Sequence, residues 1–428
     1  MNQKTISKEI TSTTEKREDW RTRAEKKRQR QLDSIPSEWR IPIPPDQYNV
    51  LQVPYECGLL DPLEIEITDT TDVNRILENL KTGKWTSVQV TRAFYKRALV
   101  AHQTTNCLTE IFLERALARA EEMDRYLKEH GKPKGPLHGL PISLKDQFKI
   151  KGLETINGYV ANIGEFAAED CVLVEILYEL GAVPFTRTNV PQTLMWGETY
   201  NNVFGRTLNP YDLRLTSGGS SGGEGALIAM RGSPLGIDTY TLNHVWTLRT
   251  SPFIQSAAIP WGKKHNGRTR KHHKCPRSDV QFPAIIDTRP WLRDPLCIRK
   301  AWDQEAYELV DHGGRGAKKC FAMLCDDGLV KPHPPVWRAM DMMKRALLAA
   351  GHEVIEWENR RHEDLFYNVE KQIFLADGDE DFKRECAKSG EPRIQTMDPE
   401  LYSHELHDPE TNRGIHIIER KSHFTAPV

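Results

Sequence analysis

Apolar residues between positions 70 and 237 recur with a helical spacing in two places. From Leu113 to Leu127 they fall every three or four positions, which predicts an amphipathic helix that ends before Gly131. A second stripe begins at Leu173 and stops at Gly181, so a second helix is expected there.

Each of these helices is followed by a short apolar run that predicts a buried strand. The run "HGLPISLKDQF" (138–148) carries one lysine, Lys145, next to Asp146, and "AVPFTRTNVPQ" (182–192) follows the second helix. A helix followed by a strand, twice over, predicts an α/β domain whose sheet is covered by helices on both faces.

The same pattern returns downstream. A strand is expected within 320–328, a helix over 336–347 that ends at Gly351, and another strand over 352–357.

The chain before residue 70 has a different character. Residues 1–35 are polar and densely charged, which predicts a solvated helical arm, and 39–62 form a proline-rich extended connector. We therefore expect an N-terminal arm and connector over 1–69 and an α/β domain over 70–428.

Residues 238–285 interrupt the domain. This stretch has no sustained period of two or 3.6 residues, and it holds six Lys or Arg and three His between 263 and 274. We treat 238–285 as aberrant within the domain.

Composition narrows the class of protein. With 428 residues, 38% apolar and 28% charged, the chain fits a globular protein, and its net charge of −1 gives it no general attraction to nucleic acid or anionic membranes. No apolar stretch is long enough to span a bilayer, and the N-terminus has no secretory apolar core. Eight cysteines without a repeated spacing favour free thiols and a cytoplasmic location.

The segment "LTSGGSSGGEGALIAMRGSPLGIDTY" (215–240) is the first candidate for chemistry. A flexible linker is rarely followed directly by a helix such as "ALIAM". A phosphate loop needs a lysine where Glu224 stands. A third interpretation is a glycine-rich loop that brings backbone N–H groups close to a substrate carbonyl and presents Ser220 or Ser221.

Such a serine requires a base, and Lys145 is the most suggestive candidate. A lysine acts as a base near neutral pH only when it is desolvated or near another cation. The alternative is a surface lysine paired with Asp146.

Taken together, these segments resemble the amidase signature family. The motifs "GLPISLKDQF", "AVPFTRTNVPQTLMWGET" and "NVFGRTLNPYDLRLTSGGSSGGEGALIAMRGSPLG" match its order and spacing, and "DDGLVKPHPPVWRAM…LLAAGHEVIEW" is similar to a later segment of its fungal acetamidase-type members. Good matching covers about 70–237 and about 285–360. The resemblance implies a mixed β-sheet core covered by helices, and a chain that is incomplete at the C-terminus of that fold.

The resemblance also implies a function. Family members hydrolyse carboxamides with a Ser–Ser–Lys triad and no metal or other cofactor. Lys145 would then be the base, Ser220 the bridging serine after a cis peptide bond, and Leu194 or Met195 would line the substrate pocket. Ser221 would support the loop. The implied partner is a small carboxamide, with neither nucleic acid nor membrane, and the sequence allows a homo-oligomer without requiring one.

The chain departs from the family where the nucleophile should stand. After "SPLG" the family continues with a segment of the kind "GTDIGGSIR", whose serine attacks the amide, whereas this chain reads "GIDTYTLNHVWTLRT". By the family spacing the nucleophile falls at His244, and the oxyanion-hole glycines fall at Thr241, Leu242 and Asn243. Ser251 and Ser256 lack flanking glycines.

Two explanations of this departure stay open. One is a reading-frame or splicing error from about 238 to about 282, which the return of family-like sequence downstream favours. The other is genuine divergence to an inactive relative. The sequence thus predicts an amide hydrolase by descent whose own activity is doubtful, with an inactive, amide-binding protein as the alternative. A third hypothesis, a nucleic-acid or metal module built on His265, His272, His273 and Cys275, lacks a second ligand pair and interleaved aromatic residues.

Overall fold

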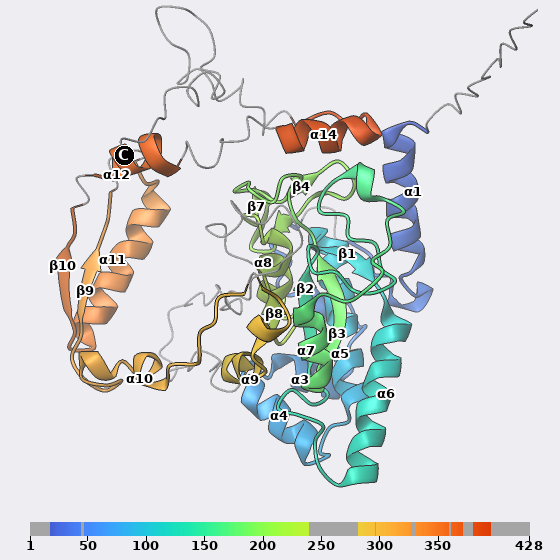
Figure 1. Ribbon diagram of the computed structural model, residues 1–428, viewed down its shortest axis with the longest axis horizontal. Helices are drawn as coiled ribbons and strands as arrows, with labels where there is room; N and C mark the ends of the chain where they lie inside the picture. The colour runs from blue at the N-terminus through green and yellow to red at the C-terminus, as the bar shows by residue number, and fades with distance from the viewer. Residues whose placement is uncertain are drawn as a thin grey trace, which may run out of the picture.

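A four-stranded sheet lies at the centre of the protein. The computed structural model describes residues 18–43, 47–238, 281–295, 297–326, 331–358, 361–370 and 380–394. Within these residues the sheet and the helices that surround it form the main body of the protein. A smaller unit of two strands and one helix stands beside the main body (Figure 1).

The central sheet is mixed. Its strands follow the order β1-β3-β2-β8, in which β1 is antiparallel to β3 while β2 runs parallel to both β3 and β8. The strands are β1 (Leu108–Ile111), β2 (Pro141–Lys145), β3 (Val183–Thr188) and β8 (Gly236–Ile237). Every residue of β2 and β3 is buried, as the continuous apolar runs predicted.

Helices surround this sheet. Between residues 62 and 229 the longer ones are α3 (Pro62–Asp69), α4 (Val73–Lys81), α5 (Ser87–Thr105), α6 (Leu113–His130), α7 (Val172–Glu179) and α8 (Gly222–Ala229). Helices α5, α6, α7 and α8 all contact β3, and α5 and α8 also contact β2. The expected helices over 113–127 and 173–180 are confirmed, and α6 ends at Gly131 in the left-handed conformation that glycine adopts readily.

Shorter elements connect these parts. They are α2 (Val53–Glu56), β4 (Tyr200–Asn201), β5 (Gly205–Arg206), β6 (Leu208–Asn209), β7 (Asp212–Thr216), α9 (Gln281–Asp287), α10 (Gln304–Tyr307) and the single turns η1 (Ser37–Trp39), η2 (Val160–Asn162), η4 (Pro290–Leu292) and η5 (Val310–His312). The pairs β4–β5 and β6–β7 are antiparallel.

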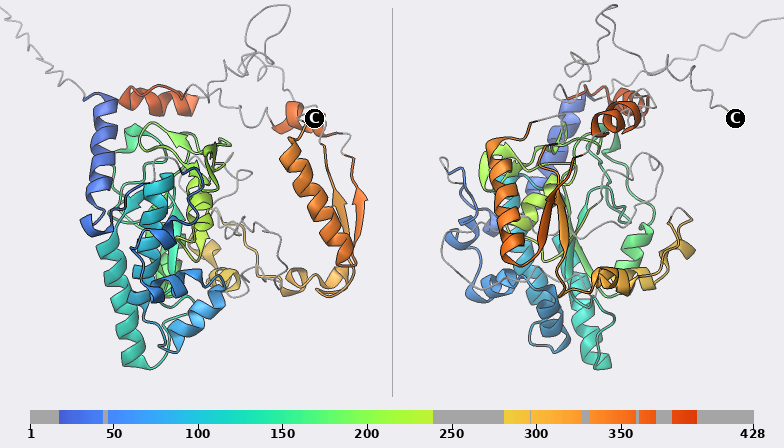
Figure 2. Two further views of the ribbon diagram at one scale, coloured as in Figure 1. Left: turned by 180° about the vertical axis from the view of Figure 1, so that it is seen from behind. Right: turned by 90° about the vertical axis from the view of Figure 1, so that its left-hand side faces the viewer.

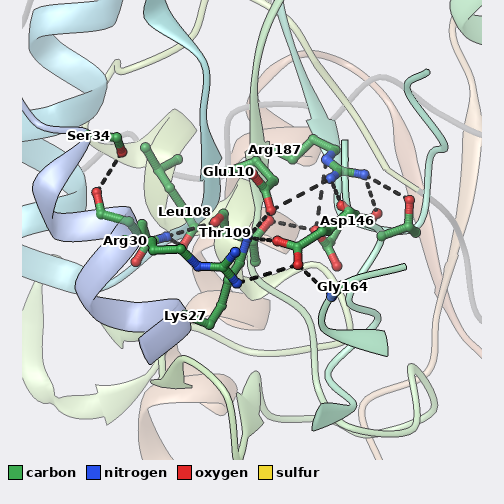
Figure 3. A network of polar contacts seen from close by, with 12 residues as sticks. Lys27, Arg30, Ser34, Leu108, Thr109, Glu110, Asp146, Gly164 and Arg187 are labelled. Atoms are coloured by element: carbon green, nitrogen blue, oxygen red, sulfur yellow. Dashed lines mark hydrogen bonds and ion pairs between the residues drawn. The ribbon is translucent and has the colours of Figure 1, made fainter. Parts of the chain in front are cut away.

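The N-terminal helix α1 (Trp20–Asp33) differs from the solvated arm that its charge predicted. Ala24, Lys27 and Gln31 are buried on one face of it. The Lys27 ammonium group forms ion pairs with Glu110 and Glu154 inside the protein (Figure 3). One face of α1 is therefore part of the body rather than a free arm. Whether 1–69 forms a unit separate from 70–428 stays a prediction.

The smaller unit consists of β9 (Cys320–Met323), α11 (Pro334–Ala349) and β10 (Glu353–Glu356). The two strands are parallel and the helix connects them, so the predicted strand–helix–strand pattern is confirmed. The left view of Figure 2 shows this unit beside the main body, and the right view shows it in front of the main body. None of the residues of α11 is buried.

The last described segment returns to the main body. It follows α12 (His362–Asp364) and η6 (Leu365–Glu370), and it contains α14 (Glu380–Ser389) and the following loop. The buried carboxylate of Glu391 accepts hydrogen bonds from Val160 N at 2.7 Å and from Gln192 Nε2 at 3.0 Å. This segment is thus anchored to the loop that follows β3.

Candidate active site

Lys145 is the last residue of β2 and is fully buried. The carboxylate of the neighbouring residue, Asp146, accepts hydrogen bonds from Thr109 Oγ1 at 2.6 Å and from Asn157 N at 2.7 Å. It lies in the network of polar contacts around Arg187 (Figure 3). The alternative of a surface lysine paired with Asp146 is therefore wrong.

The glycine-rich loop brings two hydroxyl groups to this lysine. Lys145 Nζ donates to Ser220 Oγ at 2.8 Å and to Ser221 Oγ at 3.0 Å. The peptide bond between Gly219 and Ser220 is cis, which is the arrangement that the resemblance implied. Ser221 interacts with the lysine directly, rather than supporting the loop alone.

The loop is fixed in place by its neighbours, so it is not a linker. It leads straight into α8, and Gly222 N donates to Thr199 Oγ1 at 2.9 Å. A Cβ atom at Gly223 would overlap the backbone of Asn189, which shows that only glycine allows the helix to approach this closely.

Burial changes the proton affinity of the lysine. Desolvation lowers the pKa of Lys145 from 10.5 to about 8, although the negative charges of Asp238 and Glu224 act in the opposite direction. The pKa of Asp238 is raised by burial, while Lys145 and a hydrogen bond from Ser221 act to lower it. A lysine of this kind holds a substantial neutral fraction near pH 8 and is suited to accept a proton from a serine hydroxyl.

Leu194 and Met195 come directly before Trp196, whose backbone lies against Gly219 of the glycine-rich loop. Leu194 has a positive φ of 60°, and 40% of Met195 is exposed. A Cβ at Gly219 would overlap the backbone oxygen of Trp196, so the chain just after Met195 passes directly against the cis peptide. Contact of Leu194 or Met195 with a substrate stays a prediction.

Several predicted positions lie outside the described residues. These are the family's nucleophile position, its oxyanion-hole positions, the two alternative serines and the candidate metal or nucleic-acid ligands: His244, Thr241, Leu242, Asn243, Ser251, Ser256, His265, His272, His273 and Cys275. Among the residues that are described, no group of three or more His, Cys, Asp or Glu side chains could hold a metal ion. In the same part of the chain, no helix is both long enough and apolar enough to cross a bilayer.

Sequence reasoning missed one residue at this site. Glu224, which counted only as an argument against phosphate binding, is fully buried, and its carboxylate accepts hydrogen bonds from Ser143 Oγ at 2.8 Å and Thr188 Oγ1 at 3.1 Å. The available signal was its place as the only charged residue in an otherwise small and apolar helix.

Comparison with known proteins shows the family of the chain. The family model described as Amidase matches residues 89–241. The acetamidase of Aspergillus oryzae is 38% identical over 413 residues, which cover 91% of this chain and 74% of that protein. The acetamidase of Emericella nidulans is 36% identical over 399 residues, covering 89% of this chain and 72% of its own length. The chain belongs to the amidase family.

A solved structure of a fatty acid amide hydrolase supports the same assignment. It matches with a TM-score of 0.73 and 31% identity, and the match covers 90% of this chain and 71% of that one. The mixed sheet covered by helices is thus the fold of the amidase family, as the resemblance implied. The residues matched by the family model end before position 244.

Proposed function

We propose that Lys145 and Ser220 form the proton relay of an acetamidase-type site for small linear carboxamides. The observation that carries this proposal is the 2.8 Å hydrogen bond between the two side chains, which joins a fully buried lysine to a serine that is 4% exposed. A buried lysine next to a serine hydroxyl can act as a base without a histidine.

The relay has a defined direction in amide hydrolysis. Neutral Lys145 takes the proton of Ser220 Oγ, and Ser220 takes the proton of the attacking hydroxyl as it adds to the amide carbonyl. Ser220 then gives one proton to the leaving nitrogen, which departs as ammonia, and Lys145 returns its proton to Ser220, so that water can release the carboxylic acid from the acyl-enzyme. Leu194 and Met195 are proposed to line the pocket for the acyl group.

The chain as printed lacks the attacking hydroxyl at the family position. His244 stands there, and Thr241, Leu242 and Asn243 stand where the family segment "GTDIGGSIR" has Ile, Gly and Gly, whose backbone would hold the oxyanion. We propose that this chain binds small carboxamides without hydrolysing them. A transcript that encodes the glycine-rich segment would make the same relay part of an active amidase.

Two measurements on the purified chain test this proposal. We expect no ammonia release from acetamide, and a saturable heat of acetamide binding by calorimetry. Ammonia release that Lys145→Ala abolishes would contradict the loss of hydrolysis. An absence of binding heat would contradict the retained pocket. Sequencing of the transcript across codons 230–290 distinguishes a faulty reading frame from genuine divergence.

A further inference from the structure

The carboxyl group of Glu224 lies on the face of the central sheet that carries Lys145. Ser143 and Lys145 are two residues apart on β2, so their side chains project to the same side. Thr188 of β3 is the residue paired with Lys145 across the sheet. Ser143 and Thr188 are the two hydroxyl groups that donate to Glu224.

Glu224 also covers the third strand of this face. Gly236 of β8 is paired with Ser143, and a Cβ atom at Gly236 would overlap the Glu224 carboxyl oxygen Oε2. The carboxyl group therefore contacts β3, β2 and β8 around the lysine. Only a residue without a side chain leaves room for it on β8.

The backbone that carries Glu224 is the continuation of the serine loop. Ser221 is the residue before α8, and Glu224 lies in the first turn of that helix. The hydrogen bonds of its side chain to β2 and β3 thus fasten the loop that bears Ser220 and Ser221 to the strand that bears Lys145.

From these contacts we infer that Glu224 is a positioning residue for Lys145, whose buried carboxyl group holds the serine loop on the lysine's strand and whose charge acts on the ammonium group. The inference rests on the proposed role of Lys145 as the base. It assigns Glu224 no contact with the substrate.

The effects of nearby groups on the pKa values of Glu224 and Lys145 are consistent with this role. Burial raises the pKa of Glu224 to about 8; the Ser143 and Thr188 hydrogen bonds and the Lys145 charge lower it, and the Asp238 charge adds to the increase. The negative charge of Glu224 in turn raises the pKa of Lys145 and, after the larger effect of burial, that of the Cys107 thiol. Each of the two charges therefore affects the pKa of the other group, so the titrations of Glu224 and Lys145 are linked.

The test measures the titration of Lys145 directly and requires no catalysis. The full chain is labelled with ¹³C at the lysine Cε, and the Lys145 signal is assigned by its loss in Lys145→Arg. We expect Glu224→Gln, which keeps the shape and hydrogen-bonding capacity of the side chain but removes its charge, to lower the pH midpoint of Lys145 by about one pH unit. Glu122→Gln, at a half-exposed carboxylate paired with Arg119, should leave the midpoint unchanged.

A second variant keeps the inference testable if Glu224→Gln does not fold. Ser143→Ala removes one hydrogen bond that favours the ionised carboxylate, so it should move the Lys145 midpoint in the same direction by a smaller amount. The double variant should move it no further than Glu224→Gln alone.

An unchanged Lys145 midpoint in Glu224→Gln or Ser143→Ala would overturn the inference, because a purely structural glutamate tolerates the neutral isostere. A failure of the proposed function gives a different result, since the absence of amide binding or hydrolysis would leave these titration shifts in place.

Discussion

Lys145 Nζ lies 2.8 Å from Ser220 Oγ, although the two residues are 75 positions apart in the chain. The sheet and α8 create this proximity: β2 ends at Lys145, and the loop before α8 passes over that end.

Removal of the buried ammonium group should have a pH-dependent effect on stability. The pKa of Lys145 is lowered from 10.5 to about 8 on folding, so the folded state binds this proton less tightly than the unfolded state. The cost of burying the charge is therefore fully present below pH 8 and disappears between pH 8 and 10.5. We therefore compare the free energy of unfolding of Lys145→Met with that of the parent chain at two pH values. The variant's stability minus the parent's should be about 3 kcal/mol higher near pH 6 than near pH 10.

Urea unfolding of both proteins at the two pH values checks this difference. Comparing the pH dependence, rather than the absolute stability, removes the effect of the lost hydrogen bonds from Lys145. A stability difference that is the same at both pH values would contradict the lowered pKa.

The second prediction concerns the two adjacent lysines of α1. Lys27 is buried between Glu110 and Glu154 (Figure 3), whereas Lys26 pairs with Glu18 at the surface. Lys27→Met leaves the buried carboxylate of Glu154 and the largely buried one of Glu110 without their ammonium partner, so it should destabilise the protein by about 3–5 kcal/mol. Lys26→Met should change stability by less than about 1 kcal/mol.

Denaturant unfolding of the two variants, measured side by side, separates a buried helix face from a solvated arm. Equal and small effects of both substitutions would mean that α1 is a surface arm after all.

The third prediction compares two glycines within α8. A Cβ at Gly223 would overlap backbone atoms of Asn189, which cannot move aside without disturbing the chain next to β3. A Cβ at Gly225 meets Ser217 O at 3.6 Å, an ordinary contact. Gly223→Ala should therefore destabilise by about 1–3 kcal/mol, and Gly225→Ala should stabilise the helix by up to about 1 kcal/mol.

Thermal unfolding of the two alanine variants tests the packing of α8 against the loop after β3. If both variants were stabilised alike, the close approach at Gly223 would be incorrect.

The regular elements of the main body were predictable because single segments encode them. The stripe from Leu113 to Leu127 and the run that holds Lys145 each carry their own periodicity, and tertiary packing did not override it. The same holds for α11 and β10.

The buried charged residues were not predictable in this way. Lys27 is paired with Glu110 and Glu154, 83 and 127 positions away, so nothing near it in the sequence distinguishes it from the exposed Lys26 of α1. Glu224 likewise depends on hydroxyls of two strands. The pairing of Lys145 with Ser220 came from family resemblance, since no local pattern predicts a contact between them.

The central proposal is that this chain retains a working Lys145–Ser220 relay and lacks the nucleophilic segment. Its most direct test replaces residues 238–246, "DTYTLNHVW", by the family segment "GTDIGGSIR", which returns a serine to position 244. Ammonia release from acetamide is then measured for the replaced chain, and for the same chain with Lys145→Ala or Ser220→Ala. We predict release by the replaced chain, and a loss of at least about 100-fold in each of the two variants. Release that survives both substitutions, or a folded replaced chain that binds acetamide and releases no ammonia, would contradict the account.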